Sequence, residues 1–145
     1  MTFHTSTTII AELDSLPKVI EFVHSHAILA KVPETLKNKI DLVVEELFVN
    51  IVKYSYQDVT SERTDVEIQC GKEMSADTSI ECFFLTFKDF GPPFNPLEQA
   101  PPSLDTDLDN RQVGGLGIYL VDLMADNCSY TREDESNLFH VCFNL

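Results

Sequence analysis

The main helix of this chain is predicted at the stretch Asp41-Leu42-Val43-Val44-Glu45-Glu46-Leu47-Phe48-Val49-Asn50. The apolar residues around it recur at helical spacing, which predicts one helix from about Glu34 to Tyr54 with a stripe that faces the core. The stripe consists of Ile40, Val43, Val44, Leu47 and Ile51. Such a stripe must be buried against other elements, so we expect this helix to pack on the rest of the fold.

Two polar residues lie beside the apolar stripe. Glu46 and Asn50 are four residues apart, so they stand one above the other on the helix surface. A carboxylate and an amide among apolar neighbours destabilise a fold unless a partner satisfies them. The pattern therefore has two interpretations, which are local hydrogen bonds within the helix or a pair that binds a ligand. The spacing E-x-x-x-N is too common to separate them by itself.

Length and composition favour a single globular domain that covers residues 1–145. The chain has 145 residues, 43% of them hydrophobic. No apolar run approaches the roughly 20 residues that a membrane-spanning helix needs. Acidic residues outnumber basic ones by 24 to 10, which gives a formal net charge of −14. This charge repels nucleic acid and anionic membranes, so the sequence predicts neither as a direct partner. A phosphate site here would need a metal ion and backbone N–H donors.

The N-terminus and the cysteines favour a cytoplasmic protein. The sequence begins Met1-Thr2-Phe3, without the basic start and apolar middle of a signal peptide. The cysteines lie in apolar segments without C-x-x-C spacing, which favours small buried residues in a reducing compartment over a zinc site. They are Cys70, Cys82, Cys128 and Cys142. His24 and His26 diverge on a predicted helix, so they are poor joint metal ligands.

The remaining apolar patterns predict an α+β arrangement. The predicted strands are Thr5–Ile10, Asp65–Cys70, Ile80–Lys88, Cys128–Arg132 and Leu138–Phe143. Two more helices are predicted, one after the N-cap candidate Ser15 and one from Ile118 to Ala125. Between Asn95 and Gln112 the sequence is rich in proline and aspartate and poor in apolar residues. A loop of that length is usually either functional or disordered.

A second candidate site follows the strand Ile80–Lys88. Its sequence is Asp89-Phe90-Gly91-Pro92-Pro93-Phe94. A carboxylate at a strand end can accept hydrogen bonds from a ligand, and the glycine lets a backbone or a base approach closely. The alternative is an ordinary turn, since Asp, Gly and Pro all favour turns.

A third candidate site is Gly114-Gly115-Leu116-Gly117, directly before the helix Ile118–Ala125. Glycines at a helix start can point successive N–H groups at an anion, and the helix dipole adds to the attraction. The segment is not a Walker loop, because no Lys-Ser or Lys-Thr follows it. It is not a dinucleotide fingerprint either, because no parallel βαβ unit encloses it. The alternative is a flexible helix start without a ligand.

The order of these three segments resembles the GHKL ATP-binding superfamily, which includes histidine kinases, gyrase and heat-shock chaperones. An E-x-x-x-N helix is followed by a strand ending in D-x-G-x-P-F, a long segment, and G-G-L-G at a helix start. The small size and the forms of the motifs resemble the anti-sigma factor serine kinases of bacteria. The resemblance extends over nearly the whole chain. It implies the Bergerat ATP-binding fold, an α/β two-layer sandwich with a mixed, mostly antiparallel sheet and helices on one face.

The resemblance implies a role for each motif residue. Glu46 would be the general base that activates the attacking hydroxyl, and Asn50 would bind Mg²⁺ through its side-chain oxygen. Asp89 would accept a hydrogen bond from the adenine amino group of ATP, and Gly91 would make room for the base. Gly115 and Gly117 would donate backbone N–H groups to the phosphates. The other motif residues with an implied nucleotide contact are Phe94, Gly114 and Leu116.

The long segment and two basic residues complete the expected site. The resemblance implies that Asn95–Gln112 is a lid that orders over ATP. Lys53, one turn beyond Asn50, and Arg111, near the end of the lid, could reach a phosphate, which is an inference from position and charge. The sequence departs from the kinase family at Tyr54, where a histidine is common.

The function that the resemblance implies is an ATP- and Mg²⁺-dependent serine/threonine kinase that acts as an anti-sigma factor. It would phosphorylate an anti-sigma factor antagonist protein and sequester a sigma factor, and the resemblance suggests a homodimer. A second hypothesis is a protein-binding module in which the nucleotide only sets the conformation. Glu46 favours the enzyme, because binding alone needs no general base.

Overall fold

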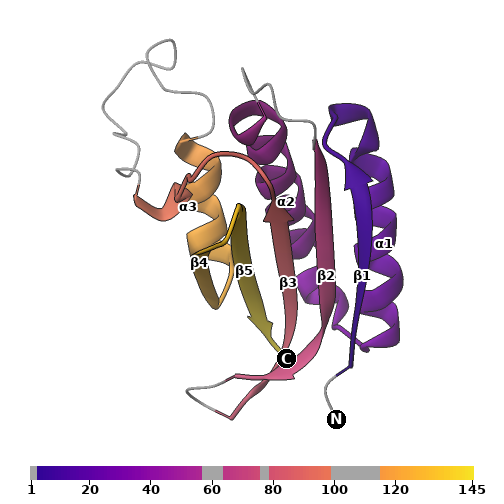
Figure 1. Ribbon diagram of the computed structural model, residues 1–145. Coiled ribbons are helices and arrows are strands. Elements are labelled where there is room, and N and C mark those ends of the chain that lie inside the picture. The colour runs from indigo at the N-terminus through magenta and orange to yellow at the C-terminus, as the bar shows by residue number, and fades with distance from the viewer. Residues whose placement is uncertain (1–2, 57–63, 76–78, 99–114) are drawn as a thin grey trace.

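Five strands and three α-helices make up most of the described chain (Figure 1). The structure is a computed structural model that describes residues 3–56, 64–75, 79–98 and 115–145. In chain order its elements are β1 (Phe3–Ile10), η1 (Leu13–Ser15), α1 (Leu16–Leu29), α2 (Glu34–Asn50), η2 (Ile51–Ser55), β2 (Asp65–Met74), β3 (Glu81–Asp89), η3 (Pro96–Glu98), α3 (Gly115–Met124), β4 (Asn127–Glu133) and β5 (Ser136–Asn144). The elements η1 and η3 are short 3-10 helices, and η2 is a π-helical turn.

The strands form one sheet in the order β1-β2-β3-β5-β4. The four pairings between these strands are all antiparallel, whereas the resemblance implied a mixed, mostly antiparallel sheet. Figure 1 shows α1, α2 and α3 behind the sheet, on the same one of its two faces. The predicted two-layer α/β sandwich with helices on one face is therefore confirmed.

The middle strand, β3, is buried on both faces. Successive side chains of a strand point to opposite faces of the sheet. Phe83 and Leu85 belong to the main core beneath the helices, whereas Cys82 and Phe84 belong to a smaller cluster on the other face. Burial on both faces explains why this strand reads as a continuous apolar run, which predicted a central position.

The main core lies between the helices and the sheet. The apolar stripe of α2 is buried there, as predicted, through Ile40, Val43, Val44, Leu47 and Ile51. The helix α1 adds Val19 and Val23, and β2 adds Val66 and Ile68. Burying one such side chain stabilises a fold by about 1.5–3 kcal/mol, so this stripe holds α2 on the sheet.

Two other details differ from the sequence prediction. The strand β2 continues to Met74, beyond its predicted end at Cys70, because it stays paired with β3 up to that residue. The hairpin between β4 and β5 is tighter than predicted. Its turn residue Asp134 has φ 54°, in the left-handed region that Asp tolerates better than most residues. Ser15 does occupy the N-cap position of α1, but its side chain makes no capping hydrogen bond.

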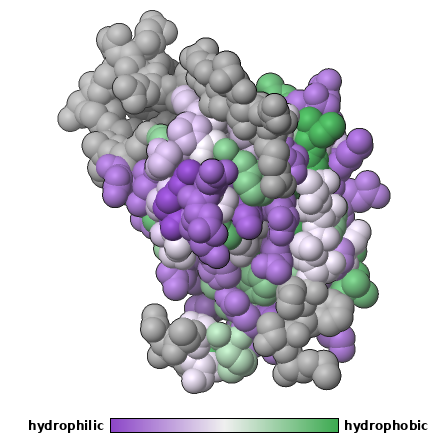
Figure 2. Space-filling model, in the orientation of Figure 1, coloured by the Kyte–Doolittle hydropathy of each residue, from purple (hydrophilic) through white to green (hydrophobic). Residues whose placement is uncertain are grey.

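Figure 2 shows the face of the sheet that carries no helix. Hydrophilic residues cover most of the coloured surface in this view, and hydrophobic residues are scattered among them. Single exposed apolar side chains of this kind are normal on a folded protein. No helix in the described ranges combines the length and the apolar composition that crossing a membrane requires.

The helix that carries Glu46 and Asn50 ends in an unusual way. Regular α-helical geometry lasts to Asn50, and the chain then widens into the π-helical turn η2 instead of continuing as the predicted helix to Tyr54. Turns of this kind are frequent at functional sites. The first residue after the turn, Tyr56, anchors it to the sheet. Its hydroxyl accepts a hydrogen bond from the N–H of Phe90 (2.8 Å) and donates one to the carbonyl oxygen of Asp65 (2.7 Å).

We expect Tyr56→Phe to lower the free energy of unfolding by about 1–3 kcal/mol, because both backbone groups lose their partner in a partly buried place. Equilibrium unfolding in urea would measure the change. Tyr119→Phe is the matched control, since Tyr119 is exposed on α3. Equal stability of the two variants would contradict the anchoring role of the Tyr56 hydroxyl.

Candidate functional site

A pocket opens between the helix layer and the sheet, where β3 ends. The open space between its walls is about 380 Å³ when the mouth is included. The residues that line it come from α2, η2, β3, the segment after β3, α3, β4 and β5. They are Leu47, Asn50, Ile51, Ser55, Phe87, Asp89, Phe94, Pro96, Ile118, Tyr130, Asn137 and Phe139. Most are apolar, and the polar ones are gathered around Asp89 and Asn50.

Of the predicted pair on α2, Asn50 lines the pocket, and Glu46, one turn earlier, is not among the lining residues. Asn50 is only 8% exposed, and its side chain has no hydrogen-bond partner among the described residues. One turn earlier, burial raises the pKa of the Glu46 carboxyl above its ordinary value of 4.5. The negative charge of Glu45 adds to this rise, and the positive charge of Lys53 opposes it. A buried amide without a partner favours the ligand-binding interpretation of the pair over local hydrogen bonds.

Asp89 lies at the end of β3 and is only 5% exposed. Its Oδ1 accepts hydrogen bonds from the Gly91 N–H (3.0 Å) and from Nδ2 of Asn137 (2.9 Å). The Ser55 side chain also hydrogen-bonds this carboxyl. Burial raises the pKa of Asp89 above its ordinary value of 3.8, while these hydrogen bonds and the charge of Arg132 oppose the rise. A carboxylate has about four acceptor positions, so it can accept one more hydrogen bond from a ligand.

Asn137 holds this end of the pocket together. It stands directly opposite Asp89 in the β3–β5 register and is 4% exposed. Besides Asp89, its Nδ2 donates to the carbonyl oxygen of Pro92 (2.9 Å). Its Oδ1 accepts hydrogen bonds from the Tyr130 hydroxyl and from Nη1 of Arg132 (3.2 Å). Through these contacts the amide links β4, β5 and the loop after β3.

Gly91 is required by a close approach of two backbone segments. A Cβ at this position would lie 2.4 Å from the carbonyl oxygen of Ser55 and 3.1 Å from its Cβ. Real Cβ atoms essentially never come that close to another heavy atom, and a backbone oxygen in a structured turn cannot move aside cheaply. The structure thus gives the glycine a packing reason that involves the π-helical turn. Its predicted role of making room for a base stays a prediction.

Two aromatic residues stand at the edge of the pocket. Phe94, which lines it, stacks on Tyr54 of η2 with ring centroids 6.3 Å apart and planes 24° apart. Tyr54, where the kinase family that the sequence resembles often has a histidine, thus packs against a pocket wall. Flat apolar walls beside a polar end suit a planar ring system with N–H groups at its edge.

The remaining predicted site residues either do not line the pocket or lie outside the described residues. Gly115 is the first residue of α3, and Leu116 and Gly117 follow it in the helix. Lys53 is exposed on η2 and does not line the pocket. Gly114, Arg111 and most of the predicted lid Asn95–Gln112 lie outside the described residues, which include only Asn95–Glu98 of that segment.

Sequence reasoning missed four polar residues of the site. They are Ser55, Tyr130, Arg132 and Asn137. In the sequence Ser55 lies just beyond the predicted helix, and Asn137 lies between the two predicted strands at the end of the chain. Their role depends on strand pairing and on the π-helical turn, so no local pattern in the sequence could have identified them.

The site can serve two chemical purposes. At one end of the pocket, the Asp89 carboxylate can accept a hydrogen bond from an N–H group at the edge of a flat heteroaromatic ring. The Asn50 end offers an amide oxygen that no described residue hydrogen-bonds, with a carboxylate one turn away, and such oxygen ligands are those that Mg²⁺ prefers. The residues present therefore fit an aromatic ligand with an attached group that needs a hard cation, such as phosphate.

We expect Gly91→Ala to lower the free energy of unfolding by about 1–3 kcal/mol, because the new methyl group collides with the Ser55 carbonyl. Pro92→Ala in the same loop is the control, and its effect should stay below about 1 kcal/mol, since the Pro92 side chain is exposed. Urea unfolding of both variants is the measurement. A Gly91→Ala variant no less stable than the control would show that the two segments can separate freely.

Comparison with known proteins identifies the family. A comparison with curated proteins found no match. Among solved structures, the chain is similar to the Acinetobacter baumannii histidine kinase AdeS, with 15% sequence identity and a TM-score of 0.44, over 95% of this chain and 67% of that chain. The profile of the family described as "Histidine kinase-like ATPase domain" matches residues 9–143. Because this match spans nearly the entire sequence, the chain belongs to the histidine kinase-like ATPase domain family, the GHKL type that its motifs resemble.

Proposed function

We propose that this protein is an ATP-dependent serine/threonine protein kinase that acts as an anti-sigma factor. Family membership supports ATP binding and kinase-like chemistry, because domains of this family bind ATP, usually with Mg²⁺. The narrower resemblance to anti-sigma factor kinases remains a prediction. The observation that carries the enzymatic part is Glu46, a carboxylate whose pKa burial raises, one turn before the unpartnered amide of Asn50.

The pocket supports adenine as the part of the ligand that is recognised. Asp89 retains acceptor capacity at the polar end, and an amino group at the edge of adenine would use it. Phe87, Phe94 and Ile118 are among the apolar walls that would cover the faces of the ring. The hydrogen bonds from Asn137 and Ser55 hold the carboxylate in place before the ligand arrives.

The α2 side supports phosphate chemistry. Asn50, with Glu46 nearby, would hold Mg²⁺, and the bound ion would neutralise charge on the phosphates. Glu46 would take the proton from the attacking Ser or Thr hydroxyl of the protein substrate. A raised pKa makes a carboxylate a stronger base, which suits this task. We further propose that the N–H groups of Gly115 and Gly117, at the start of α3, and the charges of Lys53 and Arg111 attract the phosphates.

The proposed partners follow from the resemblance and from the charge. An anti-sigma factor antagonist would be the phosphorylated protein, and a sigma factor would be the sequestered one. The net charge of −14 supports a partner with a basic patch. The role would require a cytoplasmic protein, and we propose a homodimer. The alternative remains a nucleotide-gated binding module without kinase activity.

Asp89→Asn should weaken ATP binding at least about tenfold, because a hydrogen bond to a charged group contributes about 1.5–3 kcal/mol. Isothermal titration calorimetry with Mg-ATP and Mg-GTP would measure this for the wild type and the variant. The wild type should prefer ATP, and the variant should lose that preference. Asp14→Asn, at an exposed carboxylate in η1, is the control. Equal affinity of the wild type for ATP and GTP would remove the adenine assignment.

Glu46→Gln should slow phosphate transfer by about 10²–10⁴-fold and leave ATP affinity nearly unchanged, because the amide cannot accept the proton. Asn50→Ala should weaken Mg-ATP binding as well, since it removes a metal ligand. Phosphate incorporation into the antagonist, measured beside ATP affinity, separates the two effects. Glu34→Gln, at an exposed position in the first turn of the same helix, is the control.

Transfer by Glu46→Gln at the wild-type rate would contradict the role of Glu46 as the base. The binding-module alternative would then lead, and Glu46 would be a group that orients Asn50 and the water on the metal. If the wild type binds ATP but transfers no phosphate to any antagonist, the module is likewise favoured. These outcomes leave the adenine assignment of Asp89 untouched, because it is measured by affinity alone.

A further inference from the structure

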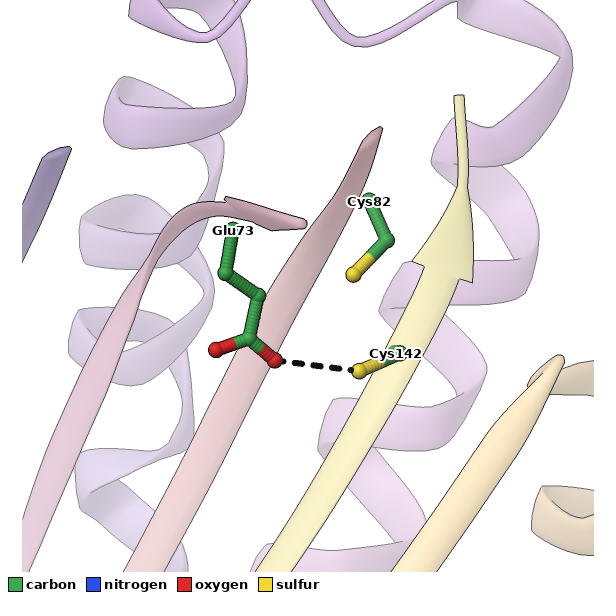
Figure 3. Close-up of side chains that lie close together, drawn as sticks. All are labelled: Glu73, Cys82 and Cys142. Atoms are coloured by element: carbon green, nitrogen blue, oxygen red, sulfur yellow. Dashed lines mark hydrogen bonds between the residues drawn. The ribbon is translucent and has the colours of Figure 1, made fainter. Parts of the chain in front are cut away.

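A cluster of thiol, imidazole and carboxylate groups lies on the face of the sheet that carries no helix. Figure 3 shows Glu73 from β2, Cys82 from β3 and Cys142 from β5 converging in front of the strands. Glu73 stands directly opposite Cys82 in the β2–β3 register. His140, two residues before Cys142, points to the same face of β5.

The ligand atoms of three of these side chains are close enough to share one ion, and His140 lies beside two of the three. The ligand atoms of Glu73, Cys82 and Cys142 all lie within 4.8 Å of one another. Oε1 of Glu73 is 3.3 Å from Sγ of Cys142 and 2.8 Å from Nε2 of His140. The same nitrogen of His140 is 3.3 Å from Sγ of Cys142. Three donors therefore surround a common point, and His140 stands next to two of them.

We propose that Glu73, Cys82, His140 and Cys142 bind a thiophilic divalent cation, with Zn²⁺ the best match. Two thiolates, one imidazole and one carboxylate are a donor set that Zn²⁺ accepts, whereas Mg²⁺ and Ca²⁺ prefer oxygen alone. Three protein ligands from three neighbouring strands already converge, and His140 would complete a closed, structural site. The ion would connect β2, β3 and β5 at the end of the sheet near the β2–β3 turn.

The surroundings orient the ligands as they do in known metal sites. Nδ1 of His140 is 2.8 Å from Oγ1 of Thr86, and this contact leaves Nε2 to face Glu73 and Cys142. The Phe84 ring stacks on the imidazole with centroids 5.5 Å apart. A partner on the remote nitrogen of a ligating histidine fixes the orientation of its ring.

Access and charge also favour a cation. Cys82 is fully buried, but the side chains of Glu73 and His140 are 31% and 32% exposed, so an ion can reach the cluster from solvent. The strongly negative net charge of the chain raises the local concentration of cations.

Burial raises the pKa of the Cys82 and Cys142 thiols, so the ion would have to displace their protons as it binds.

A disulfide between the two cysteines fits the sheet less well. Cys82 pairs with Asn144 and Cys142 pairs with Phe84, so the two cysteines are diagonal neighbours on β3 and β5. Diagonal neighbours have Cα atoms about 7–8 Å apart, whereas disulfides usually need about 4.4–6.8 Å. An ion between the sulfur atoms spans the longer distance without moving the backbone. All four cysteines are free in the structure.

Titration of the reduced, chelator-treated chain with Co²⁺ tests the proposal. Co²⁺ is a spectroscopic substitute for Zn²⁺, and the wild type should show thiolate-to-cobalt charge-transfer bands and tetrahedral ligand-field bands that saturate at one ion per chain. Added Zn²⁺ should remove these bands. The absence of thiolate bands, or a stoichiometry that never saturates, would overturn the proposal and leave the cluster as a hydrogen-bonded group without a metal.

Single substitutions assign the ligands. Cys82→Ala and Cys142→Ala should each weaken Co²⁺ binding by more than about a hundredfold, because even residues that only orient a ligand contribute about 10–100-fold. Cys128→Ala is the matched control, since Cys128 lies on β4 outside the cluster. His140→Gln, at a partly exposed position, keeps the test decisive if a buried cysteine variant does not fold. Equal loss in Cys128→Ala, or full binding by His140→Gln and both cluster cysteine variants, would contradict the assignment.

Discussion

The burial of the Asp89 carboxylate is the constraint that the rest of the site satisfies. A carboxylate at the end of the central strand destabilises the fold unless donors surround it. The donors come from three places: Gly91 in the following loop, Asn137 on the neighbouring strand, and Ser55 at the end of the π-helical turn. Because each must stand at a fixed place, the loop, the hairpin β4–β5 and the end of α2 are positioned together. The pocket is the space that this arrangement leaves beside the carboxylate.

The same constraint explains why the helix that carries Glu46 does not end as a regular helix. Ser55 must present its side chain to Asp89 and its carbonyl oxygen beside Gly91, where any larger residue would collide. The π-helical turn η2 brings it there, and the Tyr56 hydroxyl then fixes the turn to the sheet. The Asp89 end of the pocket, where we propose that adenine binds, and the Asn50 end, where we propose that Mg²⁺ binds, are therefore positioned by the same turn. Asn50 is the last α-helical residue, directly before the π-helical turn.

The central strand β3 serves both faces of the sheet. Toward the helices it contributes Phe83, Leu85 and Phe87 to the core, and Asp89 to the pocket. On the other face Cys82 joins the cluster for which we propose a metal ion. The two sites lie on opposite faces, so the metal site depends on neither ATP nor kinase activity. A metal ion near the β2–β3 turn would add a further link between strand ends that backbone pairing, the Lys72–Glu81 ion pair and the packing around Phe84 already join.

The sequence by itself determined what depends on local periodicity. The stripe of α2, the five strands, the central place of β3, and the placement of Glu46, Asn50 and Asp89 on their elements all follow from spacing along the chain. The family assignment rests on a match that extends over residues 9–143. Only the tertiary structure decided which distant residues meet. Asn137 reached Asp89, and Cys82 reached Cys142, through strand pairing. The spacing of the cysteines had argued against zinc because it reports only neighbours along the chain. Side chains alternate with a period of two, so a shift of one residue in register would move each of them to the other face, and local spacing along the chain does not reveal which residues of two strands pair.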